Sequence, residues 1–248
     1  MQRYAGSVAT LAGIHPVREA LLAGRPMDRV LIARGAGGAR VQEIVDLCRQ
    51  ARVPVRFEPR DALDRISGGA AHQGVVALVA AHQPGTLDQL PQDAELVILL
   101  DGVEDPHNLG AIVRTANAAG ASAVLIPDRR AVGLTENVAK AAAGALEHVP
   151  VLRVGNVSQA LEKLKARGFW IYALDERGAV SYTDVEYARP TALVFGGEGH
   201  GIHEHVRRHC DLTVRIPMSG RIPSLNVSVA AGVVLFEWRR RAGAPAKL

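Results

Sequence analysis

The sequence predicts an α/β protein whose larger part is built on a mainly parallel sheet. Beyond residue 91, short apolar segments alternate with longer segments in which apolar residues recur at helical spacing, as in strand–helix–strand units. Residues 96–100 are apolar throughout, which is typical of a strand buried on both faces of a parallel sheet. The composition, 48% hydrophobic and 22% charged, excludes a mostly disordered chain.

The first 80 residues are predicted to form a separate, small α/β domain. Pro16 can begin a helix and Gly24 can end it, and apolar residues have helical spacing within residues 41–51. Strands are expected at residues 30–33, 53–57 and 74–80. Residues 81–91 are polar, contain two prolines and a glycine, and are predicted to link this domain to a second one at residues 92–248.

The second domain is expected to continue the alternation of strands and helices. Its predicted strands are residues 95–100, 123–126, 149–154, 169–174, 192–195 and 212–216. Its predicted helices are residues 108–119, 135–146, 157–167 and 225–240, with Thr135 as a candidate N-cap. Because ligands bind beyond the carboxyl ends of strands in open α/β sheets, we expect functional residues in the segments 101–115, 195–202 and 217–228.

Charge and composition limit the partners and the location. The net charge is +4, and only four of the 29 basic residues are lysine. Arginine binds phosphate through a planar fork, so a nucleic-acid partner is one interpretation and ordinary surface charge is the other. The apolar runs are too short to span a bilayer, and the N-terminus lacks the apolar core of a signal peptide. A cytoplasmic protein without a membrane partner is therefore expected.

The three segments contain a few chemically informative side chains. Asn108 can cap the helix that follows it, and Arg114 lies either in a site or on a solvated helix face. Glu198 lies among four glycines, which permit close backbone approach to a ligand or simply form a turn. These glycines do not match the dinucleotide fingerprint, which disfavours a dinucleotide-dependent oxidoreductase. Ser224 lacks the surroundings of a hydrolase nucleophile and can be a plain N-cap.

A histidine-rich stretch raises the possibility of a metal site. Four histidines and Cys210 fall within residues 200–210. No second cluster supplies further ligands at matching spacing. We therefore expect a polar, partly basic surface here and no metal.

Three motifs together resemble those of a known family. NLGAIVRTANAAG at residues 108–120, LVFGGEGHGI at 193–202 and IPMSGRIPSLNVSVAAGVVLFE at 216–237 resemble, in order and spacing, the motifs of the SpoU (TrmH) family of RNA 2′-O-ribose methyltransferases. GIHPVREAL at 13–21 and AHQGVVALV at 71–79 resemble the small substrate-binding domain of the RlmB type. That type methylates a guanosine 2′-hydroxyl in the large-subunit (23S) ribosomal RNA.

The resemblance implies a fold, a cofactor and an assembly. It implies a small N-terminal α/β RNA-binding domain, followed by a SPOUT catalytic domain with a mostly parallel sheet and a deep trefoil knot near its C-terminus. It also implies S-adenosylmethionine as the cofactor and a homodimer with its sites at the interface. Pro223, where a small residue is expected, and the bulky Arg221 depart from the third motif.

The resemblance also assigns roles to individual residues. It places Arg114, Asn108, Glu198, Ser224 and Asn226 at the catalytic centre. The expected cofactor-binding residues are Gly196, Gly197, Ile216, Leu225 and Asn226. Because Arg stays protonated at neutral pH, Arg114 would clamp the phosphate beside the target ribose or stabilise the developing alkoxide. Candidate RNA contacts in the N-terminal domain are Arg25, Arg29, Arg34, Arg40 and Arg60.

The function implied is methylation of a ribose 2′-hydroxyl of a guanosine in large-subunit ribosomal RNA or in its assembly particle. A transfer-RNA 2′-O-methyltransferase is a first alternative, although the separate N-terminal domain argues against it. A non-catalytic RNA-binding or ribosome-assembly factor is a second alternative, although the motif residues are all present.

Overall fold

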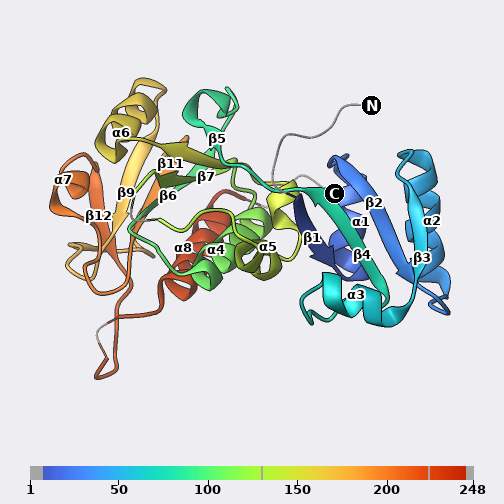
Figure 1. Cartoon of the computed structure of the whole chain (residues 1–248). Helices are drawn as coiled ribbons and strands as arrows, with labels where there is room; N and C mark the ends of the chain where they lie inside the picture. The colour runs from blue at the N-terminus through green and yellow to red at the C-terminus, as the bar shows by residue number, and fades with distance from the viewer. Residues whose placement is uncertain (1–7, 130, 223, 244–248) are drawn as a thin grey trace. The chain divides into compact units, whose positions relative to one another are not determined.

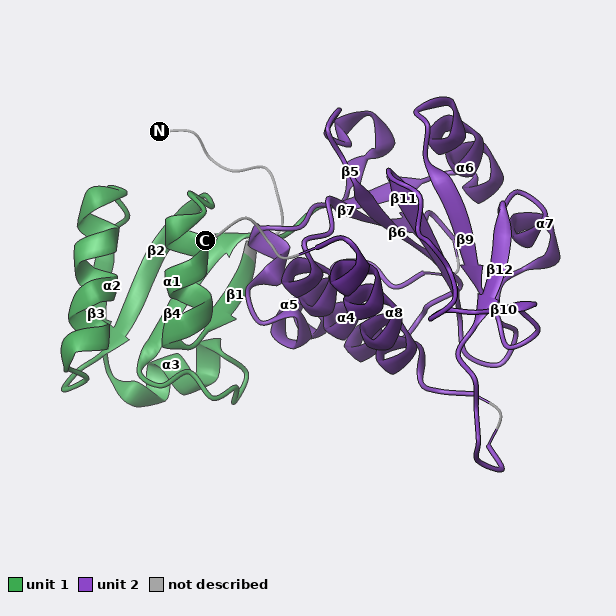
Figure 2. Ribbon diagram, turned by 180° about the vertical axis from the view of Figure 1, so that it is seen from behind, with its two compact units in different colours: residues 1–83 green, residues 84–248 purple. Residues whose placement is uncertain are grey.

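The computed structural model describes residues 8–129, 131–222 and 224–243. The chain divides into two compact units, Met1–Gln83 and Pro84–Leu248 (Figure 2). Within the described residues, no helix is both long enough and apolar enough to cross a membrane.

The N-terminal unit is a four-stranded sheet with helices on both faces (Figure 1). In the order β1-β4-β2-β3, only the β2–β3 pair is parallel. The strands are β1 (Val8–Ala12), β2 (Met27–Ala33), β3 (Val55–Glu58) and β4 (Val75–Ala80). Helices α1 (Ile14–Leu22) and α2 (Ala39–Gln50) pack on one face, and α3 (Arg60–Ile66) packs on the other through Leu63. Strand β1 and helix α3 were not expected from the sequence.

The C-terminal unit is an eight-stranded sheet in which every described pairing is parallel. This confirms the mostly parallel α/β class. The strand order is β10-β12-β9-β11-β6-β7-β8-β5. The strands are β5 (Gly85–Thr86), β6 (Leu96–Asp101), β7 (Ala123–Pro127), β8 (Val151–Val154), β9 (Trp170–Leu174), β10 (Val180–Ser181), β11 (Thr191–Gly196) and β12 (Leu212–Arg215).

Helices cover both faces of this sheet, so its central strands are buried on both sides. Side chains of β6 alternate between the two cores: Leu96 and Ile98 pack on one face, and Val97 and Leu99 on the other. One face carries α4 (Pro106–Ala119), α5 (Glu136–Ala142) and α8 (Val227–Arg241). The other carries α6 (Val157–Ala166) and the short α7 (Glu204–Arg207).

Local details differ from the expected ones in three places. The predicted helix 135–146 is capped by Thr135 but breaks at Ala143, which has a φ of 49°, before the 3-10 turn η2 (Ala145–Glu147). Asn108 does not cap α4; Asp105 does, because its Oδ1 accepts from the His107 N–H at 2.8 Å. The predicted linker 81–91 includes β5, which pairs with β8, and the 3-10 turn η1 (Leu87–Gln89).

Candidate active site

The first two candidate segments leave the sheet side by side. Strands β6 and β11 are parallel neighbours, and their last residues, Asp101 and Gly196, are in register. The Gly197 N–H donates to the Asp101 carbonyl at 2.8 Å. A Cβ on Gly197 would lie 1.9 Å from the Gly102 carbonyl oxygen, so only glycine fits this crossing.

Side chains from all three segments meet in a hydrogen-bonded triangle. Asn108 Nδ2 donates to Glu198 Oε1 at 2.8 Å, and Asn226 Nδ2 donates to Asn108 Oδ1 at 3.0 Å and to Glu198 Oε1 at 3.1 Å. The other end of the Asn226 amide caps α8, where Oδ1 accepts from the Ser228 N–H and hydroxyl. Asn108 is buried, so its amide satisfies its polar groups inside the triangle.

A cavity of about 740 Å³ opens beside this triangle, a volume within the range of small-molecule sites. Its walls combine apolar side chains such as Phe195 and Val214 with the glycine-rich turn 196–201. All five residues expected to hold the cofactor line this cavity: Gly196, Gly197, Ile216, Leu225 and Asn226. Ser224 lines it too. Ser224 does not cap α8, since Asn226 holds that position.

A second cavity of about 600 Å³ adjoins the first, and Gly197, Glu198 and His203 line both. Asn108 also lines it, together with four carboxylates and two histidines: Asp101, Glu104, Asp105, Glu198, His200 and His203. Buried Asp101 accepts through Oδ2 from the His203 backbone N–H at 2.8 Å and pairs with His203 Nδ1 at 2.9 Å. Sequence reasoning missed this Asp–His pair because its partners lie 102 residues apart.

The histidines of the histidine-rich stretch have different partners, although the His203 and His205 rings lie 5.6 Å apart. His203 pairs with Asp101, and His209 Nδ1 lies 2.7 Å from Glu162 Oε1. Among the residues that the structure describes, no group of three or more His, Cys, Asp or Glu side chains is arranged to hold a metal ion.

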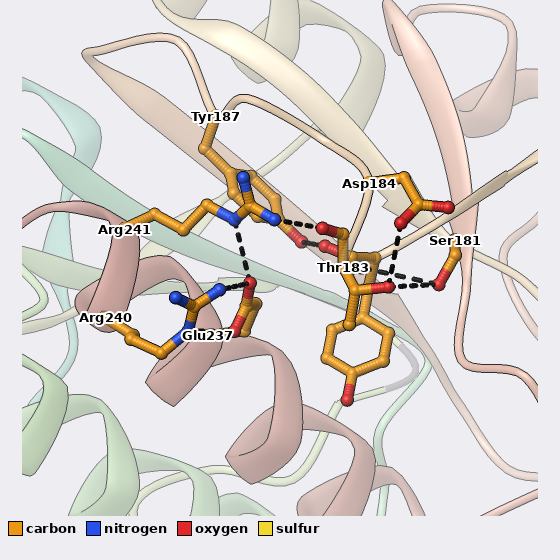
Figure 3. A network of polar contacts seen from close by, with 8 residues as sticks. Ser181, Thr183, Asp184, Tyr187, Glu237, Arg240 and Arg241 are labelled. Carbon is orange, nitrogen blue, oxygen red and sulfur yellow. Dashed lines mark hydrogen bonds and ion pairs between the residues drawn. The ribbon is translucent and has the colours of Figure 1, made fainter.

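Asn226 caps the start of helix α8, and side chains also hold its far end, around Glu237. Figure 3 shows the contacts at that far end. Glu237 accepts from Arg240 at 2.6 and 2.8 Å and from Arg241 Nε at 2.8 Å. These hydrogen bonds lower the pKa of Glu237 to about 2, and those from Arg240 have the largest effect. Arg241 also donates to the Thr183 carbonyl in the loop after β10. In the core, Trp238 Nε1 donates to Thr191 Oγ1 of β11 at 2.8 Å.

Comparison with known proteins identifies the family. Residues 95–236 match the sequence profile of the SpoU rRNA Methylase family, and residues 10–85 match that of the RNA 2′-O ribose methyltransferase substrate binding domain. The chain belongs to the SpoU (TrmH) family of RNA methyltransferases. A TrmH family tRNA/rRNA methyltransferase of Staphylococcus aureus is 42% identical to this chain over 237 residues, which cover 93% of this chain and 95% of the relative.

Two solved structures show how far the similarity to other SpoU-family proteins extends. An AdoMet-bound rRNA methyltransferase from Sinorhizobium meliloti has a TM-score of 0.82 at 27% identity and covers 96% of this chain and 88% of its own. A TrmH/SpoU tRNA modifying enzyme from A. aeolicus has a TM-score of 0.55 at 32% identity. That second match covers 62% of this chain and 81% of the other.

Arg114 lies apart from the other motif residues of this SpoU-family chain. It follows Asn108 by six positions on α4, which corresponds to a rotation of about 240° around the helix. Its side chain is exposed and lines neither cavity. Its guanidinium makes no hydrogen bond or ion pair with any described residue. Within one chain, Arg114 is therefore not positioned beside Glu198.

The five candidate RNA-binding arginines fall into two groups. In the first group, Arg25 donates to the Ala80 carbonyl from Nε at 3.2 Å and from Nη2 at 2.6 Å. Arg29 pairs with Asp28 at 2.6 Å. The other three are exposed and have no described ion-pair partner: Arg34, Arg40 and Arg60. In the third motif, Arg221 is exposed, and Pro223 lies outside the described residues.

Proposed function

We propose that this RNA methyltransferase transfers a methyl group from S-adenosylmethionine to the ribose 2′-hydroxyl of a guanosine in 23S ribosomal RNA or its assembly particle. The observation that carries the proposal is the Asn108–Glu198–Asn226 triangle, of which Glu198 and Asn226 line the 740 Å³ cavity. The triangle brings one side chain from each of the three motifs together. A protein that only bound RNA, without catalysing a reaction, would not need this arrangement.

Ribosomal RNA is the favoured substrate because of the N-terminal unit. The substrate-binding profile matches residues 10–85, which make up most of that unit. The S. meliloti rRNA methyltransferase aligns over 96% of the chain, whereas the A. aeolicus tRNA modifying enzyme aligns over only 62%. These coverages support a ribosomal substrate over a transfer RNA.

The larger cavity fits S-adenosylmethionine. Gly196 and Gly197 line it, and its apolar walls, with Ile216 and Leu225, suit an adenine ring. When bound, the cofactor supplies an electrophilic methyl group. Glu198 accepts hydrogen bonds from Asn108 and Asn226 and is held in one orientation, so its second oxygen can orient the ribose. The deep trefoil knot around this cavity belongs to the same proposal.

Arg114 completes the site in a homodimer. Because it faces away from Glu198 in its own chain, it would serve the site of a second copy. Helix α8 crosses α4 beside it, where a Cβ on Gly232 would lie 3.9 Å from Thr115. The same helix exposes Val229 and Phe236, which are 52% and 51% exposed and seven residues apart on one helical face. A second copy covering this apolar face would lie next to Arg114, which would bind the substrate phosphate or stabilise the alkoxide.

The test is transfer of labelled methyl groups from S-adenosylmethionine to unmodified 23S ribosomal RNA and, separately, to unmodified transfer RNA. We expect one alkali-resistant site in the ribosomal RNA for the wild type and none for Arg114→Ala. Calorimetry should show cofactor affinity unchanged within a few-fold in that variant. Label in transfer RNA alone would show that the protein is a transfer-RNA methyltransferase. Cofactor binding without transfer to free RNA or to assembly particles would support a binding factor.

A further inference from the structure

One edge of the N-terminal unit gathers exposed basic and aromatic side chains. In the β2–α2–β3 unit, the two strands are parallel, so their carboxyl ends lie together with the start of α2. Arg34 follows β2 directly, and its N–H donates to the Glu58 carbonyl at the end of β3 at 2.8 Å. Arg40 lies in the first turn of α2. Arg60, in turn, begins α3 just after β3.

Phe57 lies at this edge with its ring open to solvent. It pairs in register with Ile32, which is fully buried in the core under α1 and α2. Phe57 itself is 55% exposed because β3 is the last strand of the sheet. The neighbouring Glu58 pairs with Ala33, which packs toward α3, so its carboxylate lies on the opposite face from the Phe57 ring.

The arginines at this edge are not held by carboxylates. Four other arginines of the unit, Arg18, Arg29, Arg49 and Arg65, each pair with a carboxylate of the same unit. By contrast, Arg34, Arg40 and Arg60 are exposed without a described carboxylate partner, as are Arg52 and Arg56 of the same unit. Their charge is thus available to an external anion. A single exposed aromatic needs no special explanation, but one that shares the carboxyl end of its strands with three available arginines has the combination that single-stranded nucleic acids bind.

We infer that Phe57, Arg34, Arg40 and Arg60, together called the aromatic–basic edge, form a contact surface for an unpaired segment of RNA. One nucleobase stacks on the Phe57 ring, and the arginines bind the phosphates on either side of it. The inference rests on the proposed function for its partner, the RNA substrate. It goes further by assigning the chemistry of the contact: base stacking, which needs an unpaired base, and not phosphate attraction alone.

The test measures binding of the full-length chain to a fluorescently labelled single-stranded RNA and to the same sequence fully paired in a duplex. Phe57→Leu removes the aromatic ring and keeps an apolar side chain, whereas Phe57→Tyr keeps the ring. We expect Phe57→Leu to weaken single-strand binding about fivefold or more and leave duplex binding unchanged, and Phe57→Tyr to bind like the wild type.

A matched charge control comes from the opposite end of the same strand. Arg52 precedes β3 and is exposed, and its guanidinium has no described partner. Arg34→Gln, Arg40→Gln and Arg60→Gln should each weaken binding and flatten its salt dependence, whereas Arg52→Gln should do so much less.

The outcomes separate this inference from the proposed function. The aromatic–basic edge would be overturned if Arg52→Gln lost as much RNA affinity as the three edge arginine variants, or if Phe57→Leu bound single-stranded RNA like the wild type. Methyl transfer by the wild type would still uphold the proposed function. If the Phe57→Leu variant lost self-association in sedimentation and not RNA affinity, the edge would be an interface between copies. A wild-type chain that neither bound nor methylated RNA would overturn both.

Discussion

Asn108 Nδ2 and Glu198 Oε1 are 2.8 Å apart across ninety residues of chain. The contact exists because β6 and β11 are adjacent and end in register at Asp101 and Gly196. Each side chain then needs only a short segment to reach the other. Asn226 closes the triangle from the start of α8, so the geometry of the site depends on strand order more than on any single helix.

Replacing Asn108 should impair catalysis much more than folding. Asn108→Ala removes the donor to the Glu198 carboxylate, and hydrogen bonds to charged groups contribute about 1.5–3 kcal/mol. We expect methyl transfer to fall about 10- to 100-fold while the thermal midpoint changes by only a few degrees. Steady-state transfer assays and circular dichroism melts measure the two effects.

Asn117→Ala is the matched control, because Asn117 lies on the exposed side of the same helix. It should leave both activity and stability near the wild-type values. Full activity in Asn108→Ala would show that the triangle has no part in the reaction.

The fold was predictable where physical signals are local. The continuous apolar run of β6 indicated a strand buried on both faces, and both of its faces are indeed covered. Strand β1 and helix α3 were missed for different reasons. The stability of β1 comes from antiparallel pairing with β4, more than sixty residues away, and the only buried residue of the seven in α3 is Leu63.

The sequence motifs indicated which segments come together but not their geometry. Asn108, Glu198 and Asn226, one from each motif, do meet. The motifs carry no information on which way a side chain faces along α4, so they could not show that Arg114 is exposed and lines neither cavity within one chain. Nor could they reveal the Asp101–His203 pair, which depends on contacts between distant segments.

The crossing of the first two motif segments should not tolerate a side chain at residue 197. In Gly197→Ala, the new methyl group would lie 1.9 Å from the Gly102 carbonyl oxygen. One strand end must then shift, which costs about 1–3 kcal/mol. We expect a lower thermal midpoint and loss of S-adenosylmethionine binding in calorimetry. In the control Gly133→Ala, the new methyl group would have its nearest neighbour 3.8 Å away, at the end of the Arg153 side chain, so the change should be close to neutral. Similar behaviour of both variants would contradict the close approach of Gly197 to the Gly102 backbone.

Acid should remove the stabilisation that Glu237 provides. Its pKa is lowered from 4.5 to about 2 by hydrogen bonds from Arg240 and Arg241. A depressed pKa means that the contribution is fully present above about pH 4.5 and is lost as the pH falls toward 2. The stability difference between the wild type and Glu237→Gln should therefore be constant near neutrality and shrink below pH 4.5.

Denaturant unfolding at a series of pH values measures this difference. Glu176→Gln is a suitable control, since Glu176 is exposed and has no described hydrogen-bond or ion-pair partner. A difference between wild type and Glu237→Gln that did not change with pH would assign the effect to packing and not to the charge.

Mixed dimers can show whether Arg114 serves its own chain or its partner. Arg114→Ala and Glu198→Gln should each be inactive alone. If Arg114 acts across the interface, a mixed dimer contains one site with both defects and one site with neither. Because random mixing makes half the dimers mixed, the co-expressed pair should recover about a quarter of wild-type methyl transfer.

If Arg114 instead reaches Glu198 of its own chain through movement of α4, each site of the mixed dimer carries one defect. Co-expression would then restore nothing. A double variant carrying both changes, mixed with wild type, gives the converse pattern: it leaves one intact site per mixed dimer when Arg114 acts in its own chain, and none when it acts across the interface. The two mixtures together therefore assign Arg114 to one chain or the other without any change in RNA substrate.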